Sequence, residues 1–130
     1  MIPPSVTSLL VEESVAATID LEPIQFASGS DELVPASEIT LAAVAQTLNA
    51  NPSLTVRIEG HTDGDGDPAF NQDLSERRAE RVKTFLVEQG GVDEGRMETQ
   101  GFGSTQPEVS PEVSDEDKFA NRRIEFVVTN

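Results

Sequence analysis

Two oppositely charged side chains, Asp63 and Arg78, occupy positions that suit recognition of a ligand carrying both charges. At about 100° per residue on the helix predicted over residues 71–89, Arg78 falls inside the apolar arc of that helix. A guanidinium turned toward the interior keeps its charge and needs acceptors, and Asp63, on the loop leading into the helix, is the nearest candidate. The pattern predicts either an ion pair that orients the loop or a split site. In a split site, Asp63 takes an ammonium and Arg78 takes a carboxylate of one zwitterionic ligand.

The same loop carries three alternating aspartates, Asp63, Asp65 and Asp67, a spacing that superficially resembles a calcium loop. The calcium loop of an EF-hand requires glycine at its sixth position and glutamate at its twelfth, where this chain has Pro68 and Leu74. A solvated acidic turn is the simpler interpretation. Calcium binding, or a purely structural interaction through this loop, remains the alternative function.

Enzymatic chemistry is not supported by the titratable residues. His61 is the single histidine and the chain has no cysteine, so the motifs supply no set of nucleophile, base and orienting group. Two carboxylates can hydrolyse a glycan, but a glycine-rich loop is a poor rigid frame for them. His61 is expected to be a packed or hydrogen-bonded structural residue, because one histidine makes no convincing metal site. The sequence therefore predicts no enzyme, no catalytic residue, no metal and no cofactor.

Composition limits the chain to one domain and narrows its partners. Its 130 residues, 36% of them apolar, suffice for a single modest core, and no apolar run is long enough to insert into a bilayer. Asp and Glu outnumber Lys and Arg by 24 to 9, so the net charge of −15 repels nucleic acid and anionic lipid. Five of the nine basic residues nevertheless fall in two clusters: Arg77, Arg78 and Arg81, then Arg122 and Arg123.

Hydrophobic periodicity predicts the order strand, helix, strand, helix, strand, strand over residues 18–130. Residues 1–17 show no sustained period and are expected to be a linker or the tail of a preceding region. The expected strands are residues 19–26, 54–59, 96–102 and 123–129; the expected helices are residues 36–49 and 71–89; residues 103–119 form a loop with a helical turn near Asp115. Strands followed by helices should run parallel, which brings loops 27–35 and 60–70 to the edge of the sheet where such folds bind ligands.

Three ordered motifs resemble those of a known family. They are Gly60-His61-Thr62-Asp63, the run NQDLSERRA at residues 71–79, and the run NRRIE at residues 121–125. Together they resemble the OmpA-like C-terminal domain, which outer-membrane proteins, peptidoglycan-associated lipoproteins and flagellar stator anchors share. The likeness extends from about residue 19 to residue 128 and includes Phe26 and the run GFGSTQP at residues 101–107.

The resemblance implies an α/β sandwich of βαβαββ order, with a mixed four-stranded sheet packed against helices and an antiparallel last strand. It also implies noncovalent binding of the diaminopimelate residue in peptidoglycan peptide stems, which would anchor a parent protein to the cell wall. Asp63 matches the family's aspartate that holds the ligand's ammonium, and Arg78 matches the arginine that holds its carboxylate. The implied location is the cell envelope, within a larger membrane-associated or secreted protein, and any oligomer is expected to form through that parent protein.

Four further residues are expected at the pocket on the same resemblance. Asn71 matches a helix-start residue bordering the ligand, and a helix cap is an equally compatible role. Arg122 matches the first arginine of the last motif, and its alternative role is a structural ion pair with a loop acid. Backbone groups around Ala27 are expected on the opposite side, where some family members carry an acidic residue. Leu74 completes the expected set.

Overall fold

The computed structural model describes residues 7–11, 18–21 and 23–130, with side chains described from residue 23 onward. The elements in chain order are β1 (Thr7–Val11), β2 (Thr18–Leu21), α1 (Pro35–Ala50), β3 (Val56–His61), α2 (Pro68–Glu88), the 3-10 helix η1 (Glu94–Arg96), β4 (Met97–Gly101), α3 (Asp115–Asn121) and β5 (Arg123–Val128).

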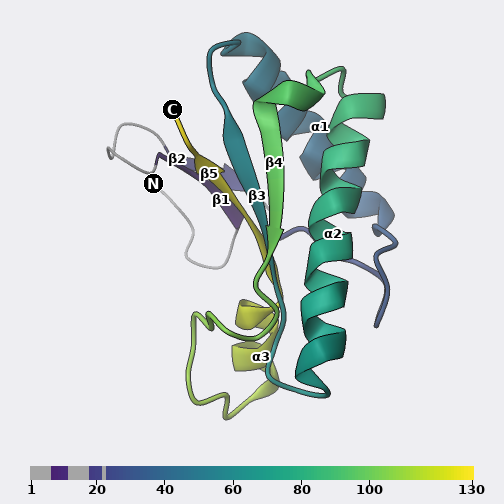
Figure 1. The fold of residues 1–130 in the computed structure, drawn as a ribbon, viewed down its shortest axis with the longest axis vertical. Coiled ribbons are helices and arrows are strands. Elements are labelled where there is room, and N and C mark those ends of the chain that lie inside the picture. Colours follow the sequence, from purple (N-terminus) through teal and green to yellow (C-terminus); the bar gives the residue numbers. More distant parts are fainter. Residues whose placement is uncertain (1–6, 12–17, 22) are drawn as a thin grey trace.

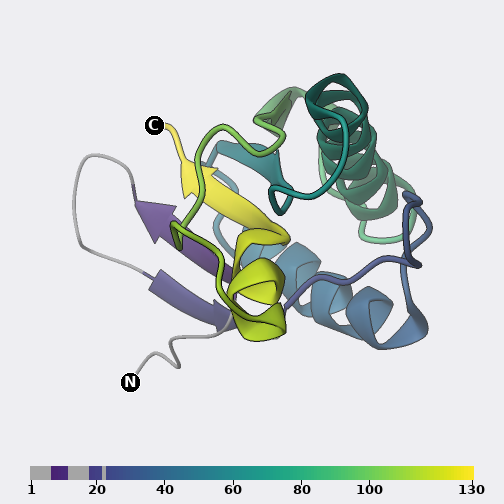
Figure 2. The same ribbon diagram turned by 90° about the horizontal axis from the view of Figure 1, so that it is seen from below.

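The strands form one mixed five-stranded sheet in the order β2-β1-β5-β3-β4. Strand β3 pairs in parallel with β4 and antiparallel with β5, while β1 pairs in parallel with β5 and antiparallel with β2. Helices α1 and α2 pack together on one face of this sheet, and α3 lies at the end where β3 finishes and β5 begins (Figures 1 and 2). The α/β class and the antiparallel last strand are therefore confirmed.

Two predictions about the first part of the chain were wrong. The sheet has five strands rather than four, because β1 forms within the stretch predicted as a linker. The strand expected over residues 19–26 is the shorter β2, and beyond it Phe26 makes only an isolated bridge to Leu33. Pro23 explains the early end, since proline has no N–H to donate to a neighbouring strand.

Alternation along the two central strands sorts their side chains between the two faces. Ile58 of β3 and Ile124 and Phe126 of β5 are at most 1% exposed and belong to the core under the helices. Successive residues of a strand point to opposite faces, so Glu59 and Glu125 project from the face turned away from α1 and α2. This alternation places charged groups on one face of β3 and β5 and the core on the other.

Gly60 is the point of closest approach between β3 and α2. A Cβ there would lie well under 3.0 Å from the backbone carbonyl oxygen of Ser75, a contact that real Cβ atoms essentially never show. Gly60→Ala is expected to lower the free energy of unfolding by about 2 kcal/mol or more, measured by urea denaturation. The matched control is Gly95→Ala, whose Cβ would meet only the Asp93 carboxylate at 3.5 Å. Equal stabilities of the two variants would contradict this packing.

Candidate functional site

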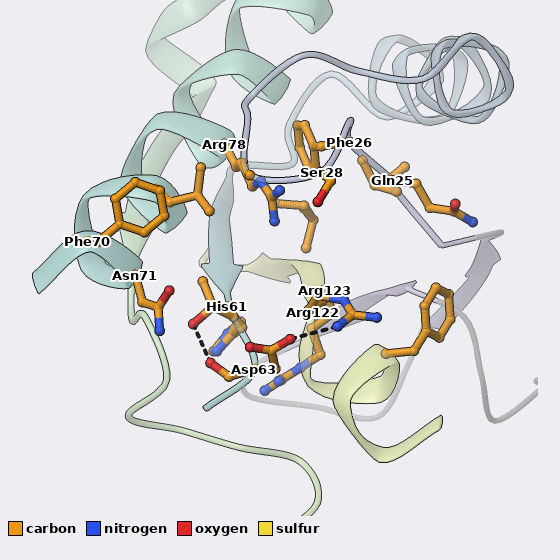
Figure 3. A pocket seen from close by; sticks show the side chains of 16 residues that line it. Gln25, Phe26, Ser28, His61, Asp63, Phe70, Asn71, Arg78, Arg122 and Arg123 are labelled. Carbon is orange, nitrogen blue, oxygen red and sulfur yellow. Dashed lines mark hydrogen bonds and ion pairs between the residues drawn. The ribbon is translucent and has the colours of Figure 1, made fainter. Parts of the chain in front are cut away.

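A pocket opens at the edge of the sheet where β3 ends, and four segments enclose it. They are the stretch from residue 24 to 29, the loop after β3, the first turns of α2 and the junction between α3 and β5. Its volume is about 490 Å³, within the range of small-ligand sites. Figure 3 shows Arg78 and Phe26 on one side of this pocket and Asp63 and Arg122 on the other. A pocket is therefore present at the edge of the sheet where ligand binding was predicted.

Arg78 is turned inward from α2, as the helical arc predicted, and is 9% exposed. Its Nε donates a hydrogen bond to the Ser30 carbonyl at 2.8 Å, and its guanidinium carbon lies 4.8 Å from the ring centroid of Phe26. Among the described side chains, no carboxylate lies within ion-pair distance of it. Burial lowers the pKa of Arg78, and the charges of Arg122 and Arg77 lower it further. The guanidinium still stays charged at neutral pH, so the pocket wall holds a cation that no acid neutralises directly.

Asp63 has a different partner from the one the sequence suggested. Its Oδ2 accepts a hydrogen bond from Nη1 of Arg122 at 2.6 Å, and its Oδ1 accepts one from the Asp65 N–H at 3.0 Å. Of the two alternatives that the sequence left open, the direct ion pair between Asp63 and Arg78 is therefore wrong for this structure. The physical reason is that Arg122 reaches the carboxylate from the α3–β5 junction, while the Ser30 carbonyl holds Arg78 on the other side. The two charges line one pocket without cancelling each other.

Arg122 combines both roles that the sequence left open. It lines the pocket, and it forms the ion pair with a loop acid. Its side chain is 42% exposed, so water screens this pair and limits its contribution to stability.

Asn71 and Leu74 both line the pocket from α2. The helix-cap role for Asn71 is wrong, because the cap is Asp67, whose carboxylate accepts from the Phe70 N–H at 3.0 Å. Asn71 lies one turn further on and donates its side-chain N–H to the Asp65 carbonyl at 2.9 Å. It therefore fixes the shape of the loop that carries Asp63.

Ala27 itself does not line the pocket, although its neighbours Phe26, Ser28 and Gly29 do. Its N–H donates to the Glu32 carbonyl at 2.8 Å, and its carbonyl accepts from the Ser30 N–H at 3.0 Å. Both backbone groups are thus used inside the loop. This correction could not come from the sequence, because it depends on the turn that the loop adopts.

Two aromatic residues at the pocket escaped the sequence analysis. Phe70 is 50% exposed and Phe119 is 39% exposed, and both line the pocket. Exposed phenylalanines in polar segments are a usable signal, since large apolar side chains left in water often mark binding surfaces. Together with Phe26 and Leu74, they give the site apolar walls between its charges.

The aspartates of the loop diverge, which disfavours the calcium alternative. Asp65 pairs with Lys118 at 3.1 Å, Asp67 caps α2 and Asp63 pairs with Arg122. The N–H of Gly64 donates to both carboxylate oxygens of Glu112 at 3.1 Å. The three aspartates of this loop are therefore each paired with a cationic side chain or a backbone N–H, and their carboxylates do not converge on one point.

His61 is a packed residue, as predicted. It is 3% exposed, and its ring stacks on Phe102 with centroids 5.1 Å apart. Burial lowers the pKa of His61, and the positive charge of Arg123 lowers it further, so the imidazole is neutral at pH 7. The hydrogen-bonded alternative is not observed, since both ring nitrogens are buried without a hydrogen-bond partner among the described residues.

Residues 25–122 match the sequence model of the OmpA family. The chain belongs to the OmpA family. It is 35% identical to outer membrane porin F of Pseudomonas aeruginosa over 118 residues, which are 91% of this chain and 33% of the porin. It is 38% identical to the peptidoglycan-binding protein ArfA of Mycobacterium tuberculosis over 106 residues, 82% of this chain and 32% of ArfA. This OmpA-family chain thus spans about a third of either relative.

Solved structures share the fold. The peptidoglycan-associated lipoprotein from Burkholderia pseudomallei superposes with a TM-score of 0.71 at 29% identity, covering 82% of this chain and 87% of the lipoprotein chain. The C-terminal domain of Helicobacter pylori MotB gives a TM-score of 0.75 at 23% identity, covering 85% of each chain, and shows likeness of fold alone.

These relatives are named as envelope or binding proteins rather than enzymes. Among the described residues, no helix of this OmpA-family chain combines the length and the apolar character that crossing a bilayer requires.

Proposed function

We propose that this OmpA-family domain binds peptidoglycan noncovalently in the cell envelope and reads the diaminopimelate residue of the peptide stems. Its relatives include a protein named for peptidoglycan binding and a peptidoglycan-associated lipoprotein. The observation that carries the proposal is the buried Arg78, which shares one pocket with Asp63 but has no carboxylate partner among the side chains of residues 23–130. A buried cation of this kind favours an anionic group supplied by a ligand.

The carboxylate of the ligand is assigned to Arg78. Its Nε is used by Ser30, and its two Nη groups make no hydrogen bond to the described residues, so they are free to donate. A carboxylate that accepts from both Nη groups gains charge-assisted hydrogen bonds of defined geometry. The face of Phe26 holds the guanidinium from the other side. The Arg78 side chain is therefore held in place before the ligand arrives, and it loses little conformational entropy on binding.

The ammonium of the ligand is assigned to Asp63. The carboxylate of Asp63 is 13% exposed, whereas the Arg122 side chain that pairs with it is 42% exposed. An exposed ion pair contributes little, so a ligand ammonium can share the carboxylate with Arg122 or replace it. The Asp65 N–H keeps its bond to Oδ1 and leaves Oδ2 as the exchangeable position.

This pair of contacts fits the free end of diaminopimelate, which carries an ammonium and a carboxylate on one carbon. A lysine-containing stem ends in an ammonium alone and would leave Arg78 unpaired. The apolar walls from Phe26, Phe70 and Leu74 accept the methylene chain between the two ends of the residue. Selectivity for diaminopimelate over lysine then follows from the cost of leaving a buried charge without a partner.

Anchoring of the domain to the wall would come from the many repeated peptide stems and would not require tight binding at a single stem. Stems recur along the wall, so a released domain meets another stem at high effective concentration. The domain would in this way hold a longer envelope protein to the cell wall. The arginines at the pocket keep the local potential favourable for an anionic stem despite the charge of −15.

The proposal is tested by co-sedimentation of the domain with purified walls of two types. The domain is expected to pellet with diaminopimelate-type peptidoglycan and to pellet at least about tenfold less well with lysine-type peptidoglycan, a difference of about 1.4 kcal/mol. Equal sedimentation with both walls would contradict the assignment of diaminopimelate. Sedimentation with neither would contradict peptidoglycan binding.

A further inference from the structure

Glu59, His61 and Glu125 form a compact group that makes none of the proposed ligand contacts, although His61 also lines the pocket. Alternation along β3 places Glu59 and His61 on the sheet face turned away from α1 and α2, and the register sets Glu125 directly opposite Glu59. Each residue offers one ligand atom, and these three atoms all lie within 4.8 Å of one another. Within residues 23–130, no other three His, Cys, Asp or Glu side chains converge in this way.

Two carboxylates facing each other across paired strands repel, and each of these two is paired with one arginine. Nε of Arg57 donates to Oε2 of Glu59 at 2.7 Å, and Nε of Arg123 donates to Oε2 of Glu125. Each carboxylate keeps a second oxygen, and Oε1 of Glu59 lies 3.5 Å from Nε2 of His61. The two arginines therefore orient the carboxylates while leaving oxygen atoms for another cation.

His61 supplies the second, independent observation. Its side chain is only 2% exposed, and neither Nδ1 nor Nε2 has a hydrogen-bond partner among the described residues. Buried polar atoms in folded proteins are nearly always paired, so such an orphan calls for an explanation such as an ion. The stack on Phe102 fixes the plane of the ring, and Nε2 is the nitrogen that lies beside Glu59.

We propose that Glu59, His61 and Glu125 bind a divalent transition-metal cation, with Zn²⁺ the best fit. One imidazole nitrogen and two carboxylate oxygens are ligands that Zn²⁺ accepts, and a three-ligand site leaves a fourth position for water. Ca²⁺ and Mg²⁺ are disfavoured because they prefer six or more oxygen ligands. Ligand atoms around tetrahedral Zn²⁺ lie about 3.4 Å apart. Small side-chain rotations would bring the three ligand atoms of this group from their present separations to that spacing. This proposal does not depend on peptidoglycan binding.

The test is calorimetric titration of the metal-stripped chain with ZnCl₂, with thermal unfolding followed in parallel. We expect one equivalent of Zn²⁺ to bind and to raise Tm, and we expect Ca²⁺ and Mg²⁺ to do neither. Glu125→Gln and His61→Asn are each expected to weaken Zn²⁺ binding at least tenfold. Glu125 is the more informative variant because its side chain is 26% exposed and its loss endangers the fold less.

The matched control is Glu98→Gln, a highly exposed acid of β4 whose carboxylate also approaches Arg57, at 4.0 Å, but lies outside the group. Its Zn²⁺ affinity is expected to equal that of the unsubstituted chain. Three results would each overturn the proposal: no Zn²⁺ binding, an equal response to Ca²⁺, or Zn²⁺ binding that survives both Glu125→Gln and His61→Asn. Circular dichroism checks that each variant is folded, so loss of binding reports on the ligands.

Discussion

Arg78→Met is expected to abolish sedimentation with diaminopimelate-type peptidoglycan while leaving the fold intact. Truncating one partner of a desolvated charge pair costs about 2 kcal/mol or more, which corresponds to at least about a 30-fold loss of affinity. Methionine can fill the space beside Phe26 without carrying a charge. Because no carboxylate of the part of the chain with described side chains pairs directly with Arg78, its replacement leaves no buried acid there without a partner. The free energy of unfolding should therefore not fall by more than about 1 kcal/mol.

The neighbouring Arg77 provides the matched control for this experiment. It lies on the same helix but outside the pocket, and its Nε donates to the Asp73 carboxylate at 2.8 Å. Arg77→Met removes the same charge from the domain, so it tests whether net charge alone governs wall binding. It is expected to sediment like the unsubstituted domain. Equal losses in the Arg77 and Arg78 variants would show that general electrostatics, and not the pocket, holds the wall.

Asp63→Asn is expected to cause a loss of similar size, at least about 30-fold, because the ligand ammonium loses its counter-charge. Asparagine keeps a side-chain oxygen that can accept from the Asp65 N–H, so the loop should keep its shape. Arg122 loses its partner as well, but its exposure limits the effect on stability. Binding isotherms from co-sedimentation measure the loss.

Asp65→Asn is the control. Asp65 lies on the same loop as Asp63 and pairs with Lys118 of α3, but it does not line the pocket. Wall binding should change less than twofold in this variant. If Asp63→Asn kept full wall binding, the proposed contact between Asp63 and the ligand ammonium would be contradicted, even if Arg78→Met behaved as expected.

The inward position of Arg78 could be predicted because a helix rotates by a fixed angle per residue. Once Leu74, Ala79 and Val82 define the buried side, Arg78 must lie on it, and these four residues are all at most 9% exposed. The strands β3, β4 and β5 and the long helices were predicted for the same reason, since their periods are local properties of the sequence.

Features that depend on distant pairing could not be predicted. The ion pair of Asp63 with Arg122 joins residues 59 positions apart, and the group around Glu59 forms only when β5 pairs with β3 in one register. Strand β1 gains its partners from β2 and β5, so its short apolar run gave no sign of its place in the sheet. Periodicity indicates which face a side chain takes, but not what lies opposite it.

The most direct measurement is an NMR titration of the isotopically labelled domain with free meso-diaminopimelate. The Nε–H of Arg78 is held by the Ser30 carbonyl and should give a resolved signal. We predict saturable shifts of this signal and of the backbone amides near Asp63, with much smaller shifts when lysine is added instead. Lack of any shift at either residue, or equal shifts with lysine, would contradict the claim that Asp63 and Arg78 together bind one zwitterion.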